Sequence, residues 1–382
     1  MKVNPNIFKE YDIRGIYPKE INKKVAREIG AVFVRFLGKK KQNIIVGRDL
    51  RSSAPKLAKG FIEGAIERGA NIIDIGAVTS PMLYYAVSLL RADAGAMITA
   101  SHNPKQYNGI KMLRGNGEMI SGSEIKKFIK NKKIGWVKKG TYKKIDIKKN
   151  YFDKVYEDFD LRLMKKIKIP HSFDYDRDRL LIRGKNKKEV RGDIIGAIVA
   201  DAIAQKKDII VCDLRCSKAV YEYFRNKGVR VITSKVGHLN IKQAMRKNKA
   251  IFGMEITGHY YFKKFHYHES PEFALRKIIE QLNNNPRLNL SEPYPVFKKF
   301  HHSGIINIRI SNLKSQISNL KEKYQNGAQN TLDGLTVEFS NWWFNIRPSH
   351  TEPIVRMVIE ANSPKLLEQK KKELMAKIKN AF

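Results

Sequence analysis

The sequence predicts a multi-domain protein of the α/β class, in which mixed α/β sheets flanked by helices are followed by a C-terminal α+β domain. Three observations predict this fold. The chain has 382 residues, which exceeds the usual size of a domain with a single hydrophobic core. Apolar runs typical of buried strands alternate with amphipathic segments of helical period in two separate regions. The tail combines further strands with only two helices.

The first alternating region predicts an α/β domain over residues 1–144. Its run NIIVGRD is typical of a buried strand, and the next segment predicts an amphipathic helix that begins at Ser52 or Ser53 and ends at Gly69. Further elements are expected in the order strand, helix, strand at 71–76, 82–92 and 94–100.

The second alternating region predicts another α/β domain over residues 191–293, and its order of elements echoes the first. Helices are expected at 193–205, 217–228, 240–248 and 271–282, and strands at 208–214, 229–235 and 250–256. Pro286 and the stretch SEPYPV end this region. The tail, 294–382, predicts a separate small α+β domain whose last helix covers 363–380.

Residues 145–190 are too few for a full α/β domain. They predict one helix at 150–166, a short strand at 167–169 and an acidic loop. We therefore expect a small connecting domain here, between two larger ones.

The charge balance is strongly basic, with 74 Lys and Arg against 37 Asp and Glu, a formal net charge of +37. Such a field attracts polyanions, so a nucleic-acid-binding protein is one hypothesis. Aromatic residues, however, are not interleaved with the basic runs as base-stacking platforms, and no zinc-knuckle or RNP-type motif is present. We interpret the excess as a solvated basic surface, which argues against nucleic acid and is compatible with small phosphates.

The cellular location is predicted from the lack of two kinds of sequence segment. No apolar run approaches the roughly 20 residues of a membrane span, and the N-terminal stretch has no signal-peptide core. A soluble cytoplasmic protein with no membrane partner is expected. The two cysteines, Cys212 and Cys216, are expected to be reduced and without a metal.

A polar turn follows the predicted strand at 94–100. The stretch TASHNP places Ser101 at the carboxyl edge of a sheet, where open α/β folds bind ligands. The G-x-S-x-G turn of a hydrolase elbow is missing, so an acyl-enzyme is not expected. From this motif alone, a ligand site and a simple turn before Pro104 are equally supported.

Three aspartates alternate in the stretch DYDRDR. In an extended segment, alternate side chains share one face, so Asp174, Asp176 and Asp178 should converge. An EF-hand loop is rejected because Arg179 and Lys185 occupy its glycine and glutamate positions. Hard oxygen ligands that leave open positions suit Mg²⁺, which takes its remaining ligands from phosphate and water. The stretch therefore predicts a magnesium site.

Two later stretches offer groups for a phosphosugar. In GMEITGHYYF, Glu255 and Thr257 present an acceptor and a donor suited to sugar hydroxyls. In RPSHTEPIVR, Arg347, Ser349 and Thr351 alternate and present a guanidinium and two hydroxyls suited to a phosphate dianion. Each of these stretches is weak by itself, since plain turns also have such residues.

In this order, TASHNP, DYDRDR, GMEITGH and RPSHTEP, together with EYDIRG at 10–15, closely resemble the motifs of the phosphohexomutase family. VGRDLRSS, YNGIK, VGHLNIK and SGIIN add to the resemblance, which extends from about Phe8 to Ala361 and favours the phosphomannomutase/phosphoglucomutase branch. It implies an enzyme that interconverts hexose 1-phosphate and hexose 6-phosphate of mannose or glucose. It also implies Mg²⁺, a hexose 1,6-bisphosphate activator and a small phosphosugar partner, in a monomer or homodimer.

The resemblance also implies roles for particular residues. Ser101 would carry a phosphoryl group and complete the Mg²⁺ site of Asp174, Asp176 and Asp178. Lys111 would be the general acid/base, with its pKa lowered by neighbouring cations. Other catalytic positions would be His102, Arg179, Arg14 and Tyr11. The sugar would be held by Glu255, Thr257, His238 and Arg215, and the phosphate not being transferred by Arg347, Ser349 and Thr351.

The sequence departs from the family pattern in its middle. Ser101 and Asp174 are only 73 positions apart, so the second domain, 145–190, looks truncated to a shortened metal-loop domain. Tyr175 stands where the family has glycine, and a positive φ there would strain the loop. His350 replaces an asparagine and Met254 a glycine. Two alternatives remain open: a phosphoglucosamine mutase, and a truncated, non-catalytic phosphosugar-binding homologue.

Overall fold

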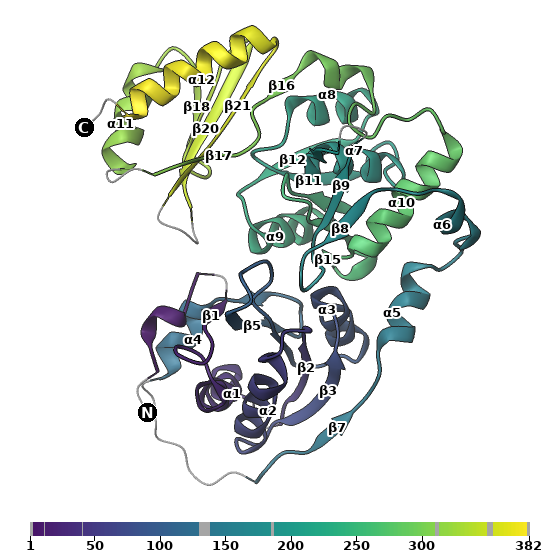
Figure 1. Cartoon of the computed structure of the whole chain (residues 1–382), viewed down its shortest axis with the longest axis vertical. Coiled ribbons are helices and arrows are strands. Elements are labelled where there is room, and N and C mark those ends of the chain that lie inside the picture. The colour runs from purple at the N-terminus through teal and green to yellow at the C-terminus, as the bar shows by residue number, and fades with distance from the viewer. Residues whose placement is uncertain are drawn as a thin grey trace. The chain divides into compact units, whose positions relative to one another are not determined.

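The computed structural model describes residues 3–10, 12–39, 41–129, 138–184, 187–309, 313–349 and 354–379 (Figure 1). The chain forms two compact units. The first contains Met1–Leu180 and the later segment Tyr260–Arg276, and the second contains Leu181–His259 and Lys277–Phe382. Among the described helices, none is long and apolar enough to cross a membrane.

The first unit is built on a mixed sheet with the strand order β1-β5-β4-β2-β3-β7, and β6 pairs with β5. Its inner strands are parallel to one another, and β5 and β1 are antiparallel to their neighbours. The strands are β1 (Ile13–Ile16), β2 (Asn43–Arg48), β3 (Asn71–Ala77), β4 (Ala94–Ile98), β5 (Tyr107–Arg114), β6 (Met119–Ile120) and β7 (Tyr142–Lys144). The expected α/β class is confirmed for this part of the chain.

Helices α1 (Lys23–Leu37), α2 (Ala54–Ile66), α3 (Ser80–Leu89) and α4 (Gly122–Ile129) flank this sheet (Figure 1). Helix α1 begins where the Asn22 side chain accepts hydrogen bonds from two backbone amides, and it ends at Gly38 with φ of 69°. Helices α1 and α2 pack backbone to backbone, because a Cβ at Gly64 would lie 1.9 Å from the Arg27 carbonyl oxygen.

The middle of the chain differs from the sequence-based expectation in detail. The single helix expected at 150–166 is two helices, α5 (Lys148–Val155) and α6 (Arg162–Lys166), because Asp158 between them has φ of 58°, which a helix cannot contain. The short strand falls at β8 (His171–Phe173) rather than at 167–169.

The segment Tyr260–Arg276, which lies in the range 191–293, belongs to the first compact unit. It contains β14 (Tyr260–Phe262), η2 (Lys263–Phe265), β15 (His268–Glu269) and the start of α10 (Pro271–Asn284). The buried Tyr151 hydroxyl lies 3.0 Å from both Ser270 Oγ and Glu272 Oε2. These contacts attach the segment to α5.

The second unit begins with a hairpin of β9 (Leu180–Arg183) and β10 (Glu189–Val190). It continues with parallel strands in the order β12-β11-β13, as the alternating pattern predicts. Their bounds are β11 (Ile209–Asp213), β12 (Arg230–Ser234) and β13 (Phe252–Met254), and the helices here are α7 (Gly192–Asp201), α8 (Lys218–Asn226) and α9 (His238–Asn248).

The C-terminal part of the second unit is an antiparallel sheet with strand order β16-β21-β20-β19-β18, and β17 pairs with β21. The strands are β16 (His301–His302), β17 (Ile306–Ile308), β18 (Ala328–Asn330), β19 (Leu335–Glu338), β20 (Trp342–Pro348) and β21 (Val355–Ala361). Helices α11 (Leu313–Lys323) and α12 (Pro364–Lys379) complete it, and Leu335, Phe344, Met357 and Leu374 belong to its core. The predicted α+β fold is confirmed.

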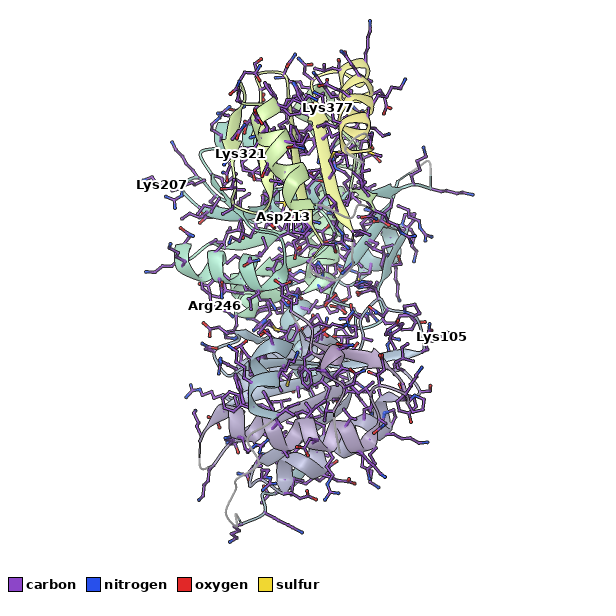
Figure 2. All side chains as sticks on the ribbon, turned by 90° about the vertical axis from the view of Figure 1, so that its left-hand side faces the viewer. Lys105, Lys207, Asp213, Arg246, Lys321 and Lys377 are labelled. Atoms are coloured by element: carbon purple, nitrogen blue, oxygen red, sulfur yellow. The ribbon has the colours of Figure 1, made fainter. Side chains whose placement is uncertain are left out.

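The basic charge is distributed over the surface of each unit. Figure 2 shows Lys105 on the first unit and Lys207 and Lys321 on the second, and all three side chains are exposed. This distribution agrees with a solvated basic surface.

Substitution of Gly64 by alanine tests the close packing of α1 and α2. The added methyl group meets backbone and not a flexible side chain, so the helices must separate. We expect Gly64→Ala to lower the free energy of unfolding by about 1–3 kcal/mol, despite the better helix propensity of alanine. Urea denaturation measures this. Lys59→Ala, at an exposed position of the same helix, is the control and should change little. Equal stability of the two variants would contradict the packing described here.

Candidate active site

Ser101 lies in the turn directly after β4 and is 3% exposed. Its φ of 49° is in the left-handed region, which is unfavourable for a residue with a Cβ. The Ser101 hydroxyl donates to Asp174 Oδ2 at 3.2 Å and lies 3.3 Å from His102 Nδ1. Its backbone amide donates to Thr99 Oγ1 at 2.9 Å. The turn thus holds Ser101 against the acidic loop.

The three aspartates of the acidic loop converge as predicted, but they do so in a turn and not in an extended segment, because the Arg177 amide donates to the Asp174 carbonyl oxygen at 3.1 Å. One carboxylate oxygen from each of Asp174, Asp176 and Asp178 lies within 4.8 Å of the others. The loop stays in place partly because Ser80 donates its hydroxyl to Asp176 Oδ2 at 2.6 Å and its amide to the Asp176 carbonyl at 2.9 Å. Within the described residues, Asp176 Oδ1 is buried and has no hydrogen-bond partner.

This cluster has the electrostatics of a cation site. Burial, then the charges of Asp178 and Asp176, raise the pKa of Asp174 to about 7. A divalent cation would remove that penalty and supply the partner that Asp176 Oδ1 lacks. Carboxylate oxygens are also the ligands that Mg²⁺ prefers. The residues therefore fit the predicted magnesium site.

Lys111 on β5 lies beside the acidic cluster, with its Nζ 2.6 Å from both Asp176 Oδ2 and Asp178 Oδ2. Burial by itself would lower the pKa of Lys111, but these two carboxylates outweigh burial and hold the pKa well above its ordinary value. The direction is opposite to the sequence-based expectation, which considered neighbouring cations and not the contacts with two carboxylates. Lys111 is therefore a charged donor in this structure.

Further cations surround Ser101. Arg14 donates to Asn103 Oδ1 and pairs with Asp12, and Arg179 Nε lies 3.8 Å from Asp174 Oδ2. The His102 side chain is exposed, yet desolvation, followed by the charges of Arg179, Arg14 and Lys111, lowers its pKa to about 4. His102 is accordingly neutral at pH 7. Tyr11, the remaining predicted catalytic residue, lies outside the described residues.

The first unit has a cavity of about 570 Å³ beside the serine turn, lined by His102, Phe173, Asp174, Tyr175 and Arg177. Tyr175 does not have the positive φ considered above, since the left-handed residue of the loop is Arg177, with φ of 54°. The half-exposed Tyr175 ring instead lies over the Arg51 guanidinium, 4.6 Å from ring centroid to Cζ. The tyrosine is thus accommodated without that strain.

The second unit contains the predicted sugar-binding residues. Arg215 is buried after β11, donates to both oxygens of Asp213 at 2.9 and 2.7 Å, and reaches Glu255 Oε2 at 3.4 Å. Thr257 Oγ1 lies 3.2 Å from His259 Nδ1. His238, also predicted for this group, is the first residue of α9.

Two of the predicted phosphate-binding residues, Arg347 and Ser349, lie at the end of β20. Arg347 is 1% exposed, and burial followed by the charge of Arg215 lowers its pKa, as expected for two cations that face a shared region. The Ser349 amide donates to the Ile354 carbonyl at 2.8 Å. Thr351 and the neighbouring His350 lie outside the described residues.

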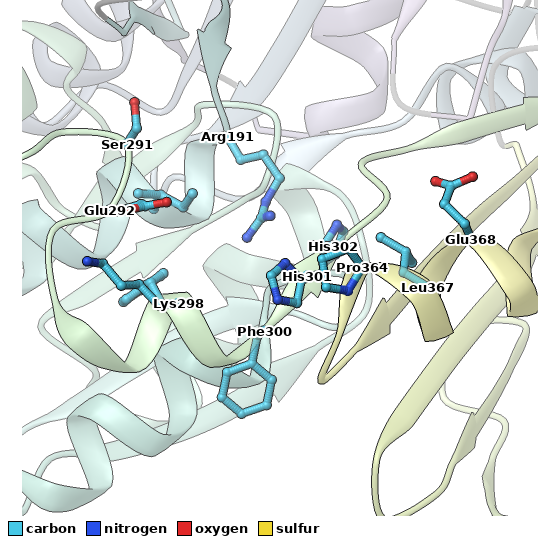
Figure 3. A pocket seen from close by; sticks show the side chains of 12 residues that line it. Arg191, Ser291, Glu292, Lys298, Phe300, His301, His302, Pro364, Leu367 and Glu368 are labelled. Atoms are coloured by element: carbon cyan, nitrogen blue, oxygen red, sulfur yellow. The ribbon is translucent and has the colours of Figure 1, made fainter.

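A second cavity, of about 610 Å³, contains none of the predicted site residues (Figure 3). Figure 3 shows the guanidinium of Arg191 directed toward His301 and His302. His302 Nε2 lies 2.9 Å from the Arg215 carbonyl oxygen, and its Nδ1 accepts from the Gly304 amide at 2.9 Å. Burial and then the charge of Arg191 lower the pKa of His302 to about 3, so the ring is neutral. Its hydrogen bonds are structural.

Sequence reasoning missed the residues that hold the two buried arginines. Asp49 and Arg51 form an ion pair with Nε and Oδ2 3.2 Å apart, and Asp213 holds Arg215 in the same way. Both pairs occur in the tripeptide Asp-Leu-Arg directly after a buried strand. The sequence pattern that could have predicted these ion pairs is an aspartate and an arginine two residues apart at the end of an apolar run.

Comparison with known proteins agrees with this fold. Residues 5–134 match phosphoglucomutase/phosphomannomutase, alpha/beta/alpha domain I; residues 191–299 match domain III; and residues 305–377 match the C-terminal domain. The phosphomannomutase of Methanocaldococcus jannaschii is 33% identical, with 96% of each chain covered. That alignment extends over 439 positions, more than the 382 residues here, so the relative has residues that this chain lacks.

Solved structures show the same fold. A phosphoglucomutase/phosphomannomutase family protein from Burkholderia thailandensis has a TM-score of 0.86 at 23% identity, covering 100% of this chain and 98% of that one. Aspergillus fumigatus N-acetylphosphoglucosamine mutase, in complex with glucose 1,6-bisphosphate, has a TM-score of 0.56 at 13% identity and coverages of 98% and 95%. The same enzyme has also been solved with GlcNAc-6P and magnesium, with a TM-score of 0.50, 14% identity and coverages of 88% and 82%.

These matches define a mutase, an enzyme of the isomerase class that acts in carbohydrate metabolism. The chain belongs to the alpha-D-phosphohexomutase family, in its phosphoglucomutase/phosphomannomutase branch.

Thermal unfolding with and without Mg²⁺ tests the acidic loop as a metal site. A ligand that binds only the folded state at about a hundred times its Kd adds about 2.7 kcal/mol, so we expect the melting temperature to rise by about 2–4 °C. Asp174→Asn and Asp176→Asn should abolish this rise, whereas Asp153→Asn, an exposed carboxylate on α5, should leave it intact. An equal rise in all four proteins would exclude the loop as the magnesium site.

Proposed function

We propose that this enzyme interconverts hexose 1-phosphate and hexose 6-phosphate, with mannose or glucose as the sugar, by phosphoryl transfer through Ser101. The observation that carries the proposal is the contact between the Ser101 hydroxyl and Asp174, within the converging acidic loop and next to Lys111. A serine in such surroundings is suited to carry a phosphoryl group, because cations and hydrogen-bond donors can stabilise the charge of the transferred group.

In the proposed reaction, the bond between phosphorus and Ser101 Oγ breaks, and a bond forms between phosphorus and a free hydroxyl oxygen of the hexose monophosphate. The product is a hexose 1,6-bisphosphate. After this bisphosphate reverses its orientation, its other phosphoryl group returns to Ser101 Oγ, which leaves the isomeric monophosphate. We assign the proton transfers to Lys111 because its Nζ lies beside the acidic loop. It would protonate Ser101 Oγ as the bond to phosphorus breaks and, as the resulting amine, accept the sugar proton.

Asp174, Asp176 and Asp178, with an oxygen on Ser101, would hold Mg²⁺. When bound, this ion would supply positive charge that stabilises the transferred phosphoryl group. Arg14 contacts Asn103 and Arg179 contacts Asp174, both next to this serine, and His102 contacts its hydroxyl. The two arginines contribute charge and the neutral imidazole contributes a hydrogen bond.

Recognition of the substrate is assigned to the second unit. Glu255 and Thr257, with Arg215 and His238, would bind the sugar hydroxyls. Arg347, Ser349 and Thr351 would bind the phosphate that is not transferred. The two buried guanidiniums of Arg215 and Arg347 support this assignment, because a dianion relieves the mutual repulsion of two cations in a poorly solvated place. Hexose 1,6-bisphosphate would act as the activator that restores phosphorylated Ser101.

Ser101→Ala tests the phosphoryl carrier. We expect the wild-type protein, primed with glucose 1,6-bisphosphate, to convert mannose 1-phosphate or glucose 1-phosphate in a coupled assay, and Ser101→Ala to lose at least about a thousandfold in kcat. Intact-protein mass spectrometry should find one phosphate on the wild type and none on the variant. Ser123→Ala, a surface serine on α4, is the matched control. Wild-type turnover by Ser101→Ala would exclude this role.

The same assay separates the alternatives. Conversion of glucosamine 1-phosphate in preference to both hexose phosphates would favour a phosphoglucosamine mutase. Binding of hexose phosphates without turnover or phosphorylation by the wild type would identify the non-catalytic homologue.

Arg347→Lys tests the phosphate site. Lysine keeps the charge but loses the planar fork of donors, and each charge-assisted hydrogen bond contributes about 1.5–3 kcal/mol. We expect KM for the phosphosugar to rise about 10- to 100-fold with little change in kcat, since the contact is made in both ground and transition states. Steady-state kinetics measure this, and the exposed Arg309→Lys should behave as wild type. A loss of kcat at constant KM would contradict the assignment.

A further inference from the structure

Arg51 is a buried arginine to which the reaction above assigns no role. We propose that Arg51, held by Asp49, is a positioning residue that keeps the turn carrying Ser101 in its reactive conformation, and that Tyr175 couples this arginine to the acidic loop. The proposal rests on the proposed phosphoryl transfer, because it concerns the geometry of the same serine.

The guanidinium of Arg51 is saturated by hydrogen bonds, and most of them go to a single turn. Its Nε donates to Asp49 Oδ2 at 3.2 Å. The two terminal nitrogens donate to four carbonyl oxygens between 2.6 and 3.2 Å away, those of Ser101, Asn103, Pro104 and Tyr107. One side chain therefore fixes the path of the backbone from the serine to the start of β5. A lysine has no fork of donors with which to replace it.

Asp49 fixes the other side of the serine peptide. It is 1% exposed, and its Oδ2 accepts the Thr99 hydroxyl at 2.7 Å. The Thr99 oxygen in turn accepts the Ser101 amide at 2.9 Å. The amide and the carbonyl of Ser101 are thus both tied to one buried ion pair. Such restraint is what a left-handed serine requires, since relaxation of φ from 49° would redirect its hydroxyl.

Tyr175 connects this network to the acidic loop. The residue stands between Asp174 and Asp176, and its ring lies over the Arg51 guanidinium. Stacking of an aromatic ring on a guanidinium is favourable, more so when the cation is desolvated. Arg51 therefore contacts both loops that must meet at the phosphoryl group. A displacement of about 1 Å between reacting groups can lower a rate about a hundredfold.

The second unit has the same tripeptide with a different target. After β11, Asp213 holds Arg215 through the backbone amide at 2.8 Å and the side chain, as Asp49 holds Arg51 after β2. There the guanidinium contacts a carboxylate, Glu255, rather than carbonyl oxygens of a turn. The tripeptide Asp-Leu-Arg thus presents an arginine rigidly in both units. In the first unit, that arginine donates hydrogen bonds to the backbone of the serine turn.

Kinetics of Arg51→Ala and Arg51→Lys test the proposal in the full-length protein. We expect kcat to fall about a hundredfold in both variants, with KM for glucose 1-phosphate within about threefold of wild type. Guanidinium chloride at a low millimolar concentration should restore about tenfold of the kcat of Arg51→Ala, because the free cation can occupy the vacated position. Sodium chloride at equal ionic strength should not. Arg225→Ala, at an exposed position of α8, is the control.

Tyr175 is tested in a double-mutant cycle. Tyr175→Phe keeps the ring and should retain wild-type kcat, whereas Tyr175→Leu should lower kcat several-fold. In the Arg51→Ala background, Tyr175→Leu should have no further effect, because the contact it removes is already lost. Independent effects of the two substitutions would refute the coupling.

Hydrogen exchange separates a failure of this proposal from a failure of the proposed function. Peptides covering 99–107 should exchange faster in Arg51→Ala than in wild type, while the melting temperature changes little. Absence of mutase activity in the wild type would overturn the function, and the exchange rates would still decide whether Arg51 holds the turn. Wild-type kcat in Arg51→Ala would overturn the positioning role. The positioning role would also be overturned if Arg51→Ala lost activity, guanidinium did not restore that activity, and the melting temperature of the variant fell sharply.

Discussion

The mutual repulsion of three carboxylates is the physical constraint on which the first unit depends. Carboxylate oxygens of Asp174, Asp176 and Asp178 lie within 4.8 Å of one another, and burial, followed by the charges of Asp178 and Asp176, raises the pKa of Asp174 to about 7. Lys111 offsets part of this charge through contacts at 2.6 Å. The remaining excess is what makes the loop suited to a divalent cation and, through it, to a phosphoryl group.

Hydrogen bonds from buried residues fix the two loops that form this charged site. The Ser101 turn is held by the buried pair of Asp49 and Arg51, and the acidic loop is held by Ser80. The Ser101 turn leaves β4, whose Ala94, Ala96 and Ile98 belong to the buried core of the first unit, whereas the acidic loop connects β8 to β9. Strained or repulsive arrangements persist in proteins when their surroundings over-determine them, and this site follows that rule.

A segment that is distant in sequence contacts the acidic loop. The segment Tyr260–Arg276 joins the first unit, and its Glu272 lies 3.5 Å from Arg177 of the acidic loop and 3.0 Å from the Tyr151 hydroxyl. Burial raises the pKa of Glu272, and these contacts partly compensate for that burial. A few residues that are distant in sequence thereby support the loop.

The sequence by itself determined the α/β and α+β classes, the order of the elements and the chemical types at the site, because periodicity and local turn chemistry act over a few neighbouring residues. The convergence of the three aspartates was predicted from their alternation in an extended segment, but the structure achieves it through a turn in which Arg177 has φ of 54°. Only the tertiary structure decided that two carboxylates raise the pKa of Lys111 and that Arg51 holds the serine turn. These properties depend on contacts and solvation between residues far apart in the chain, which local sequence patterns do not encode.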